Sequence, residues 1–261
     1  MKKTPNQPPN NQGLYRPSFE KDNCGFGLIA QMDDEASHWL VETAIAALAR
    51  LTHRGAVAAD GKTGDGCGLL MKKPDGFLRL CADELGFKLA ENYAVGMVFL
   101  NTDDALANAA RQQLETELRA EGLDVLGWRT VPVDNSGLGY SVVPTEPRIR
   151  QVFIARGANC ADQEAFERKL FVIRKIVGNQ VRVSDMADKE YFYIPSMSSR
   201  TVLYKGMLLA GQVGEYYQDL NDERMVSALA LVHQRFPPNT FPHWDLAPPF
   251  RMTAPKGQHN P

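Results

Sequence analysis

The sequence lacks several features that would place it in a specialised class of protein. Among its 261 residues, no apolar run approaches the roughly 20 residues that are needed to span a bilayer. Lys2 and Lys3 are followed by no apolar segment, so the start does not resemble a secretory signal. A formal net charge of -2 leaves no basic surplus to neutralise phosphates. We therefore expect a cytoplasmic protein that binds neither a membrane nor nucleic acid.

Metal ligands are also sparse and badly spaced. The 4 cysteines lie at irregular intervals, at positions 24, 67, 81 and 160, and form no Cys-x-x-Cys pair. The 5 histidines show no ligand spacing with one another or with the cysteines. We therefore predict no metal site and no disulfide framework, and we expect Cys67, Cys81 and Cys160 to be reduced thiols.

What is present is a pattern of apolar residues that predicts an α+β fold. Helical spacing marks 37–55, where Gly55 is expected to cap the helix, and helices are also expected at 77–90, 104–122 and 163–177. Strands are expected at 24–32, 67–74, 93–100, 124–132, 148–156 and 189–198, while 225–236 fits a helix or a strand. Strands outnumber helices and do not alternate with them strictly, which favours sheets packed under helices.

Part of this pattern has a recognisable order of its own. Between about 92 and 198 the expected elements run β-α-β-β-α-β, which is the ferredoxin-like pattern. We therefore predict an inserted subdomain over this range.

The glycine-rich stretch "GAVAADGKTGDG", residues 55–66, invites comparison with a phosphate-binding loop. The interval from Gly55 to the Gly61-Lys62 pair is one residue too long for that motif. A helix is expected before the stretch and a strand after it, which reverses the order that aims a helix N-terminus at an anion. The glycines are better explained by tight turns and close backbone approach beside a site.

Cys24 is the candidate nucleophile. The 23 residues before it hold four prolines and four asparagines and little to bury, so they are not expected to fold alone. A cysteine before a buried strand can simply be a small core residue. If the chain is cut between Asn23 and Cys24, however, the new α-amine has a pKa near ~7.7–8.0 and can take the proton of a thiol with a usual pKa of about 8.5. Both interpretations remain open from these residues alone.

Three segments together carry a family resemblance: "NCGFGLIA", "LTHRGAVAADGKTGDGCGLL" and "HQRFPPNTFPHWDLAPPFRM". They are similar to the start of the glutamate synthase large subunit, a class II glutamine amidotransferase domain of the N-terminal-nucleophile hydrolases. The match runs in order from about residue 15 to 253. The resemblance implies a four-layer αββα sandwich over 24–261 and a propeptide over 1–23 that is removed to expose Cys24.

The same resemblance assigns roles to individual residues. Cys24 corresponds to the nucleophile that attacks the side-chain amide of L-glutamine and forms a thioester, with release of ammonia. Arg235 corresponds to the clamp on the substrate α-carboxylate, although an arginine that merely caps an apolar segment is the alternative. Gly257 would donate its N–H to the oxyanion hole, but Lys256 stands where the family has an asparagine. Pro237 and Pro238 also replace small hydroxyl residues.

For the whole family, the resemblance implies glutamate synthesis from glutamine and 2-oxoglutarate. The resemblance places FMN and an iron–sulfur cluster in other domains, so this stretch is expected to hold no cofactor. It also implies that NADPH or ferredoxin supplies electrons, and that a small flavoprotein subunit or ferredoxin is the partner.

The departures near the C-terminus keep alternatives open. Together with the end at Pro261, they predict a truncated domain, incomplete at its C-terminus, which is either an enzyme or a catalytically dead binding module. A sister amidotransferase, such as an asparagine synthetase or a purine-pathway enzyme, is disfavoured because several of these carry the cysteine directly after the initiator methionine.

Overall fold

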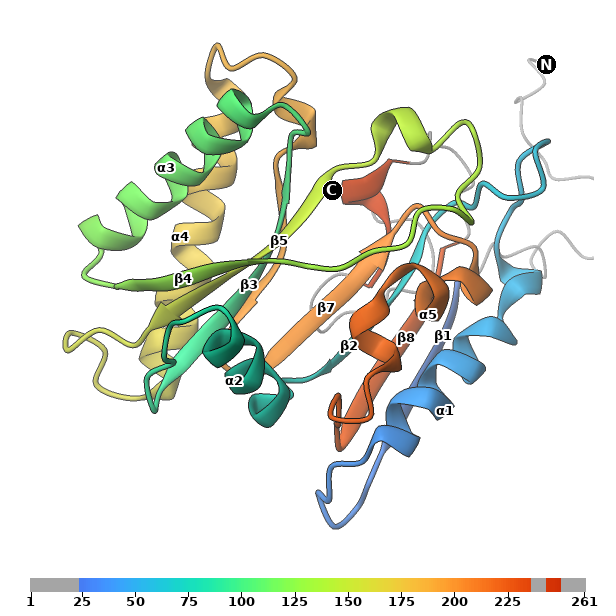
Figure 1. The fold of residues 1–261 in the computed structure, drawn as a ribbon, viewed down its shortest axis with the longest axis horizontal. Coiled ribbons are helices and arrows are strands. Elements are labelled where there is room, and N and C mark those ends of the chain that lie inside the picture. The colour runs from blue at the N-terminus through green and yellow to red at the C-terminus, as the bar shows by residue number, and fades with distance from the viewer. Residues whose placement is uncertain (1–23, 236–242, 250–261) are drawn as a thin grey trace, which may run out of the picture.

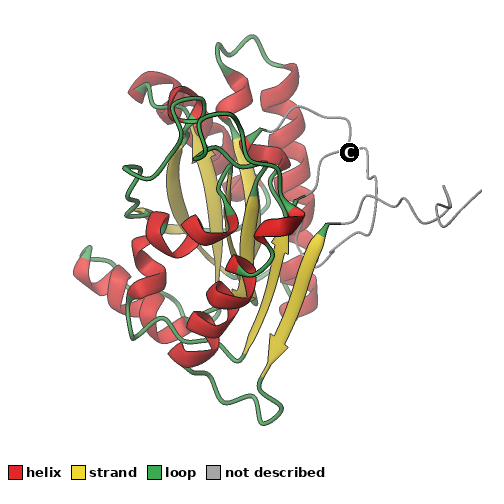
Figure 2. Cartoon of the chain, turned by 90° about the vertical axis from the view of Figure 1, so that its right-hand side faces the viewer, coloured by secondary structure: helices red, strands yellow, loops and turns green. Residues whose placement is uncertain are grey.

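The structure is a computed structural model that describes residues 24–235 and 243–249. Two four-stranded antiparallel sheets form its centre, and helices flank the strands (Figures 1 and 2). The propeptide predicted over 1–23 and the candidate residue Gly257 lie outside the described residues. Within those residues, no helix is both long enough and apolar enough to cross a bilayer.

The first sheet joins segments from both ends of the described chain. Its strands lie in the order β1-β8-β2-β7, with bounds β1 Gly25–Ala30, β8 Leu229–Gln234, β2 Cys67–Lys72 and β7 Thr201–Gly206. Every neighbouring pair is antiparallel. The register of β1 on β8 runs from Gly25 opposite Gln234 to Ala30 opposite Leu229. The start of β1 therefore meets the end of β8. The segment that fitted a helix or a strand by its sequence contains strand β8.

Helix α1, His38–Ala49, lies along β1 and β8 (Figure 1). Its N-cap is Ser37, whose hydroxyl accepts a hydrogen bond from the Leu40 N–H at 3.3 Å. The prediction that Gly55 caps this helix is wrong, because the helix ends at Ala49 and a 3-10 turn over Thr52–Arg54 follows. Gly55 has extended backbone, and a Cβ there would lie 2.2 Å from Gln234 Nε2. Gly55 therefore serves the close approach of two segments rather than a helix end.

The second sheet confirms the predicted β-α-β-β-α-β order. Its elements are β3 Tyr93–Leu100, α3 Asp104–Ala120, β4 Val125–Thr130, β5 Arg148–Ala155, α4 Gln163–Val183 and β6 Tyr193–Ser198. The strand order β4-β5-β3-β6 places the first and third strands of the unit in the middle. Helix α4 extends beyond the predicted 163–177, because Val181 still faces the core.

Two hydrophobic cores follow from this arrangement. One lies between the second sheet and helices α3 and α4, where Val98 and Ile154 meet Leu114 and Leu170. The larger core includes the buried face of α1 and the inward residues of both sheets. It also contains residues of helix α2, Asp75–Glu84, and of the short helix α5, Val213–Tyr216. Helix α2 is shorter than the predicted helix at 77–90. The fold is thus α+β with two antiparallel sheets and helices packed on them.

The two sheets are tied together at their edges. Strands β6 and β7 follow each other through Ser199 and Arg200, and each is the edge strand of its own sheet. The segment after β8 returns as 243–249, with a 3-10 turn over Trp244–Leu246, and the Trp244 ring meets Phe99 of the second sheet edge-on at 6.0 Å between centroids. The first sheet, the second sheet and this segment therefore form one packed unit.

Candidate active site

Cys24 lies directly before β1, at the edge of the first sheet. Because Gly25 is opposite Gln234 in an antiparallel pair, the next position along the register places Cys24 opposite Arg235. The Cys24 side chain is partly buried. Side chains alternate along a strand, and Gly25 faces Arg54 and Leu51, so Cys24 shares the opposite face with Phe26. Cys24 and Arg235, two of the three site residues that the resemblance predicted, are therefore neighbours across the sheet.

Arg235 is fixed by its backbone and lies near two carboxyl groups and a thiol. Its N–H donates to the Gly66 carbonyl at 3.0 Å, which continues the pairing of β8 with β2. Burial lowers the pKa of Arg235, and the acidic groups of Asp65, Cys24 and Asp245 offset part of that effect. The guanidinium thus lies near both the thiol and a carboxylate, partly out of water.

Asp65 occupies the centre of the "GDG" turn between the 3-10 turn after α1 and strand β2. It is 8% exposed, and its Oδ2 accepts a hydrogen bond from the Ala56 N–H at 2.8 Å. Burial raises its pKa, whereas the Ala56 N–H and the Arg235 charge work in the opposite direction. The flanking glycines are required by contact, because a Cβ at Gly64 would lie 2.6 Å from the Leu208 carbonyl oxygen.

The segment 243–249 closes another side of this turn. Gly66 has φ +108, and a Cβ there would lie 2.8 Å from the Cβ of Ala247. Lys205 on β7 donates from Nζ to the carbonyls of Asp245 at 2.8 Å and Ala247 at 2.7 Å. His243 and Asp245 are joined by a contact of 2.5 Å between Nδ1 and Oδ1, which raises the pKa of His243.

His233 shares a sheet face with Arg235, two positions earlier on β8. It is 1% exposed, and among the described residues neither ring nitrogen has a hydrogen-bond partner. Burial lowers its pKa from 6.5 to about 4, so the ring is neutral near pH 7. It lies between Phe26 of β1 and Gly68 of β2 in the register of the sheet.

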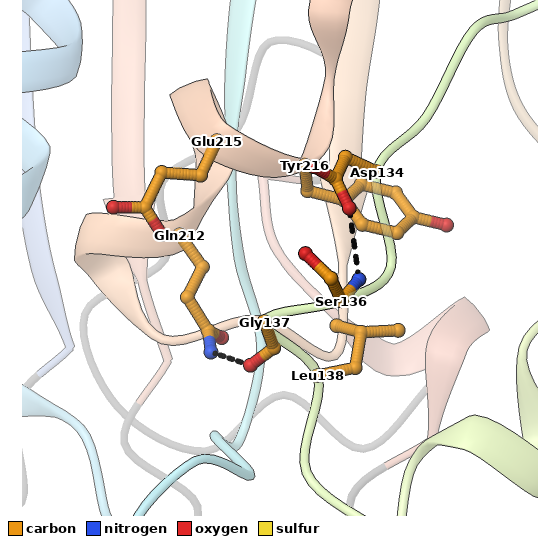
Figure 3. Close-up of a pocket in the computed structure, with 7 residues that line it drawn as sticks. All are labelled: Asp134, Ser136, Gly137, Leu138, Gln212, Glu215 and Tyr216. Atoms are coloured by element: carbon orange, nitrogen blue, oxygen red, sulfur yellow. Dashed lines mark hydrogen bonds between the residues drawn. The ribbon is translucent and has the colours of Figure 1, made fainter.

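A separate cavity of about 220 Å³ lies between the 134–138 loop and the segment that carries α5 (Figure 3). Its walls include Asp134, Gln212 and Glu215, and Gln212 Nε2 donates to the Gly137 carbonyl at 2.8 Å. No arginine or lysine is among its lining residues, so it offers no cationic side chain to pair with a carboxylate. Neither Cys24 nor Arg235 lines it, and we do not assign the site to it.

The described residues do not fit an iron–sulfur cluster. Such a cluster needs several cysteine thiolates together. Cys24, Cys67, Cys81 and Cys160 are all unpaired, and no group of three or more His, Cys, Asp or Glu side chains within residues 24–235 and 243–249 could hold a metal ion. No step of the chemistry below uses such a group.

Sequence patterns found only part of this arrangement. Cys24 and Arg235 were predicted, whereas Asp65, Lys205 and His233 were not. A lysine in the apolar strand "TVLYKG" and an acid between two glycines were available signals. Each acquires its meaning only from a partner far away in the sequence.

Two antiparallel sheets under helices, with a cysteine at the start of an edge strand and an arginine beside it, define the class: an N-terminal-nucleophile hydrolase fold. A family model described as "Glutamine amidotransferases class-II" matches residues 24–261, and the chain belongs to this family.

Curated relatives narrow the similarity further. The chain is 44% identical to the glutamate synthase [NADPH] large chain of Bacillus subtilis (strain 168), over 98% of this chain and 17% of that protein. It is 42% identical to the glutamate synthase [NADPH] large chain of Azospirillum brasilense, over 94% of this chain and 16% of that protein. It is 37% identical to ferredoxin-dependent glutamate synthase 2 of Synechocystis sp., over 92% of this chain and 15% of that protein. The chain thus spans less than a fifth of the length of these relatives.

Proposed function

We propose that this domain hydrolyses the side-chain amide of L-glutamine, with Cys24 as the nucleophile after removal of residues 1–23. The observation that carries the proposal is the register of β1 on β8, which sets Cys24 opposite Arg235. The family match supports it, since the matched region begins at Cys24.

The chemistry follows from having a thiol and an amine on one residue. The free α-amine of Cys24 takes the thiol proton, directly or through a water, and the sulfur attacks the amide carbon. Ammonia leaves with that proton, and a thioester between Cys24 and the glutamyl group remains. Water then cleaves the thioester, which releases glutamate and restores the thiol.

Arg235 supplies the recognition of the substrate. Its planar guanidinium can hold both oxygens of the α-carboxylate, and partial burial strengthens that contact. Asp65 lies close enough to offset part of the effect of burial on Arg235, and the Ala56 N–H holds its carboxylate. We infer that Asp65 balances part of the charge of the guanidinium when no substrate is present.

The oxyanion contact is expected to be weaker than in the family. We propose that the Gly257 N–H donates to the developing oxyanion, whereas Lys256 cannot reproduce an asparagine amide. Removal of one such donor typically costs about 10²–10³ in rate. Both residues lie outside the described part of the chain.

We further propose that the ammonia serves glutamate synthesis, as the names of the relatives suggest, and that 2-oxoglutarate is its acceptor. Those names specify NADPH or ferredoxin, so either NADPH with a flavoprotein subunit or ferredoxin is the expected source of electrons. We also propose a cytoplasmic location, which the four unpaired cysteines support.

The test is ammonia release from L-glutamine by the protein and by two cysteine variants. Cys24→Ala is expected to lose all activity, whereas Cys160→Ala should keep it, because Cys160 is a buried core residue on the far side of the second sheet. Activity retained by Cys24→Ala would remove Cys24 from the mechanism. A protein that binds glutamine without releasing ammonia would instead be the non-catalytic binding module.

A further inference from the structure

Lys205 is a buried lysine that the proposed mechanism does not use. It lies near the end of β7, and its side chain is 0% exposed. Its Nζ donates to two backbone carbonyls of one segment, those of Asp245 and Ala247. The Nζ also lies 4.5 Å from the centroid of the Tyr193 ring. One side chain therefore fixes the 243–249 segment at two points.

The surroundings of Lys205 are built for this contact. Gly68 is its partner across the β2–β7 pair, and a Cβ at Gly68 would lie 2.7 Å from the Pro248 carbonyl oxygen. The missing side chain thus lets the 243–249 segment lie directly on the sheet. On the other side, the Tyr217 hydroxyl donates to the Lys205 carbonyl at 2.7 Å and holds the backbone of β7.

A continuous series of contacts leads from this anchor to the substrate clamp. Lys205 holds the Ala247 carbonyl, and Ala247 packs against Gly66 with no room for a Cβ between them. The Gly66 carbonyl accepts the hydrogen bond from the Arg235 N–H. A shift of Ala247 would therefore move Gly66 and, with it, the backbone of Arg235.

Stability alone does not account for a charged residue at this position. The pKa of Lys205 is lowered to about 7, chiefly by burial; the charge of Asp245 raises it, and the charges of Arg174 and Arg235 lower it. Taking an ammonium out of water is costly, and well-packed apolar residues of similar volume are often at least as stable in such places. A methionine would fill the space without that cost but could not hold the two carbonyls.

We propose that Lys205 is a positioning residue for glutamine hydrolysis. By holding residues 245–247 against Gly66, Lys205 fixes the position of Arg235, which binds the substrate carboxylate. This inference rests on the proposed function. It assigns Lys205 no contact with the reacting atoms, so its loss should weaken substrate binding more than the chemical step.

The test compares Lys205→Met with Lys73→Met. Lys73 is a matched control, because its Nζ lies 3.6 Å from the Tyr93 ring centroid and donates to the Tyr93 carbonyl, but it follows the other end of β2. We expect Lys205→Met to raise the KM for glutamine about tenfold, which corresponds to about 1.4 kcal/mol of lost binding free energy. Its kcat should change less than about threefold, and Lys73→Met should leave KM unchanged.

Two further measurements keep the outcome clear. Lys205→Arg retains a cationic side chain with several hydrogen-bond donors, so it should recover part of the affinity for glutamine that Lys205→Met loses. An unchanged KM in Lys205→Met, or equal changes in KM in Lys205→Met and Lys73→Met, would overturn the proposal. Amide exchange at Arg235 does not depend on activity and should quicken in Lys205→Met but not in Lys73→Met. If the unaltered protein releases no ammonia, the proposed function fails. Separately, an unchanged rate of amide exchange at Arg235 in Lys205→Met would refute the proposal that Lys205 positions Arg235.

Discussion

At the scale of the residue, Arg235 combines a fixed backbone with a partly buried guanidinium beside Cys24. Arg235→Lys should raise the KM for glutamine by about 10–100-fold, because a lysine keeps the charge but cannot bind both carboxylate oxygens. Initial rates across a glutamine series measure the effect. Arg224→Lys is the control, since Arg224 forms an exposed pair with Asp222 away from the site. Equal KM values for all three proteins would contradict a clamp at Arg235.

His233 gives a second prediction at this scale. Its pKa is about 4 in the folded protein and near 6.5 when exposed, so the unfolded chain binds the extra proton between these values. Its neutral form therefore stabilises the fold above about pH 6.5, and this contribution is lost as the pH falls towards 4. Between these pH values the free energy of unfolding falls by up to ~1.4 kcal/mol per pH unit.

Urea unfolding between pH 4.5 and 7.5 tests this dependence. His233→Gln should flatten the fall in the free energy of unfolding, whereas His53→Gln should not, because His53 is exposed. Parallel curves for the unaltered protein and His233→Gln would show that His233 is not held neutral by burial.

At the scale of the element, some glycines have a neighbouring atom where a Cβ would lie, whereas others have open space there. A Cβ at Gly68 in β2 would lie 2.5 Å from the Tyr204 carbonyl oxygen, so Gly68→Ala should destabilise the protein and displace the 243–249 segment. Gly178 in α4 has nothing within 4 Å of a Cβ, so Gly178→Ala should stabilise it by about 0.5–1 kcal/mol through helix propensity. Thermal unfolding should show a lower melting temperature for Gly68→Ala and a higher one for Gly178→Ala. A Gly68→Ala variant that is more stable than the unaltered protein would contradict the close packing around Gly68.

The same scale shows why sequence patterns located some elements and missed others. Helices α3 and α4 were predicted because each buries one face, which leaves a clear period in the sequence. Strand β8 is largely buried on both faces, so its apolar run fitted either state. Strand β7 was not predicted, and the end of α1 was misplaced because Gly55 meets Gln234, a contact that local sequence cannot reveal.

At the scale of the whole molecule, one buried ion pair links β4 to the 3-10 turn Gln218–Asn221. Arg129 donates to both carboxylate oxygens of Asp219, at 2.7 and 2.5 Å, and the Tyr204 hydroxyl donates to the same carboxylate at 3.1 Å. Arg129→Met should cost about 3–5 kcal/mol of unfolding free energy, because it leaves Asp219 charged and buried.

A second substitution separates this explanation from simple loss of packing. Adding Asp219→Leu to Arg129→Met removes the stranded charge and should restore much of the stability. The exposed pair of Arg224 with Asp222 gives the control, since Arg224→Met should change the free energy of unfolding little. A double variant that is less stable than Arg129→Met would contradict the account of a stranded charge.

The most direct test of the whole account is covalent labelling of the protein by a glutamine analogue that carries an electrophile in place of the side-chain amide. The account predicts a chain that begins at residue 24 and carries one adduct, on Cys24, whose formation L-glutamine slows. Mass spectrometry of the intact protein and of its peptides reads all three features. Labelling that glutamine does not slow, or an adduct on another cysteine, would contradict the assignment of Cys24 as the nucleophile of a glutamine site.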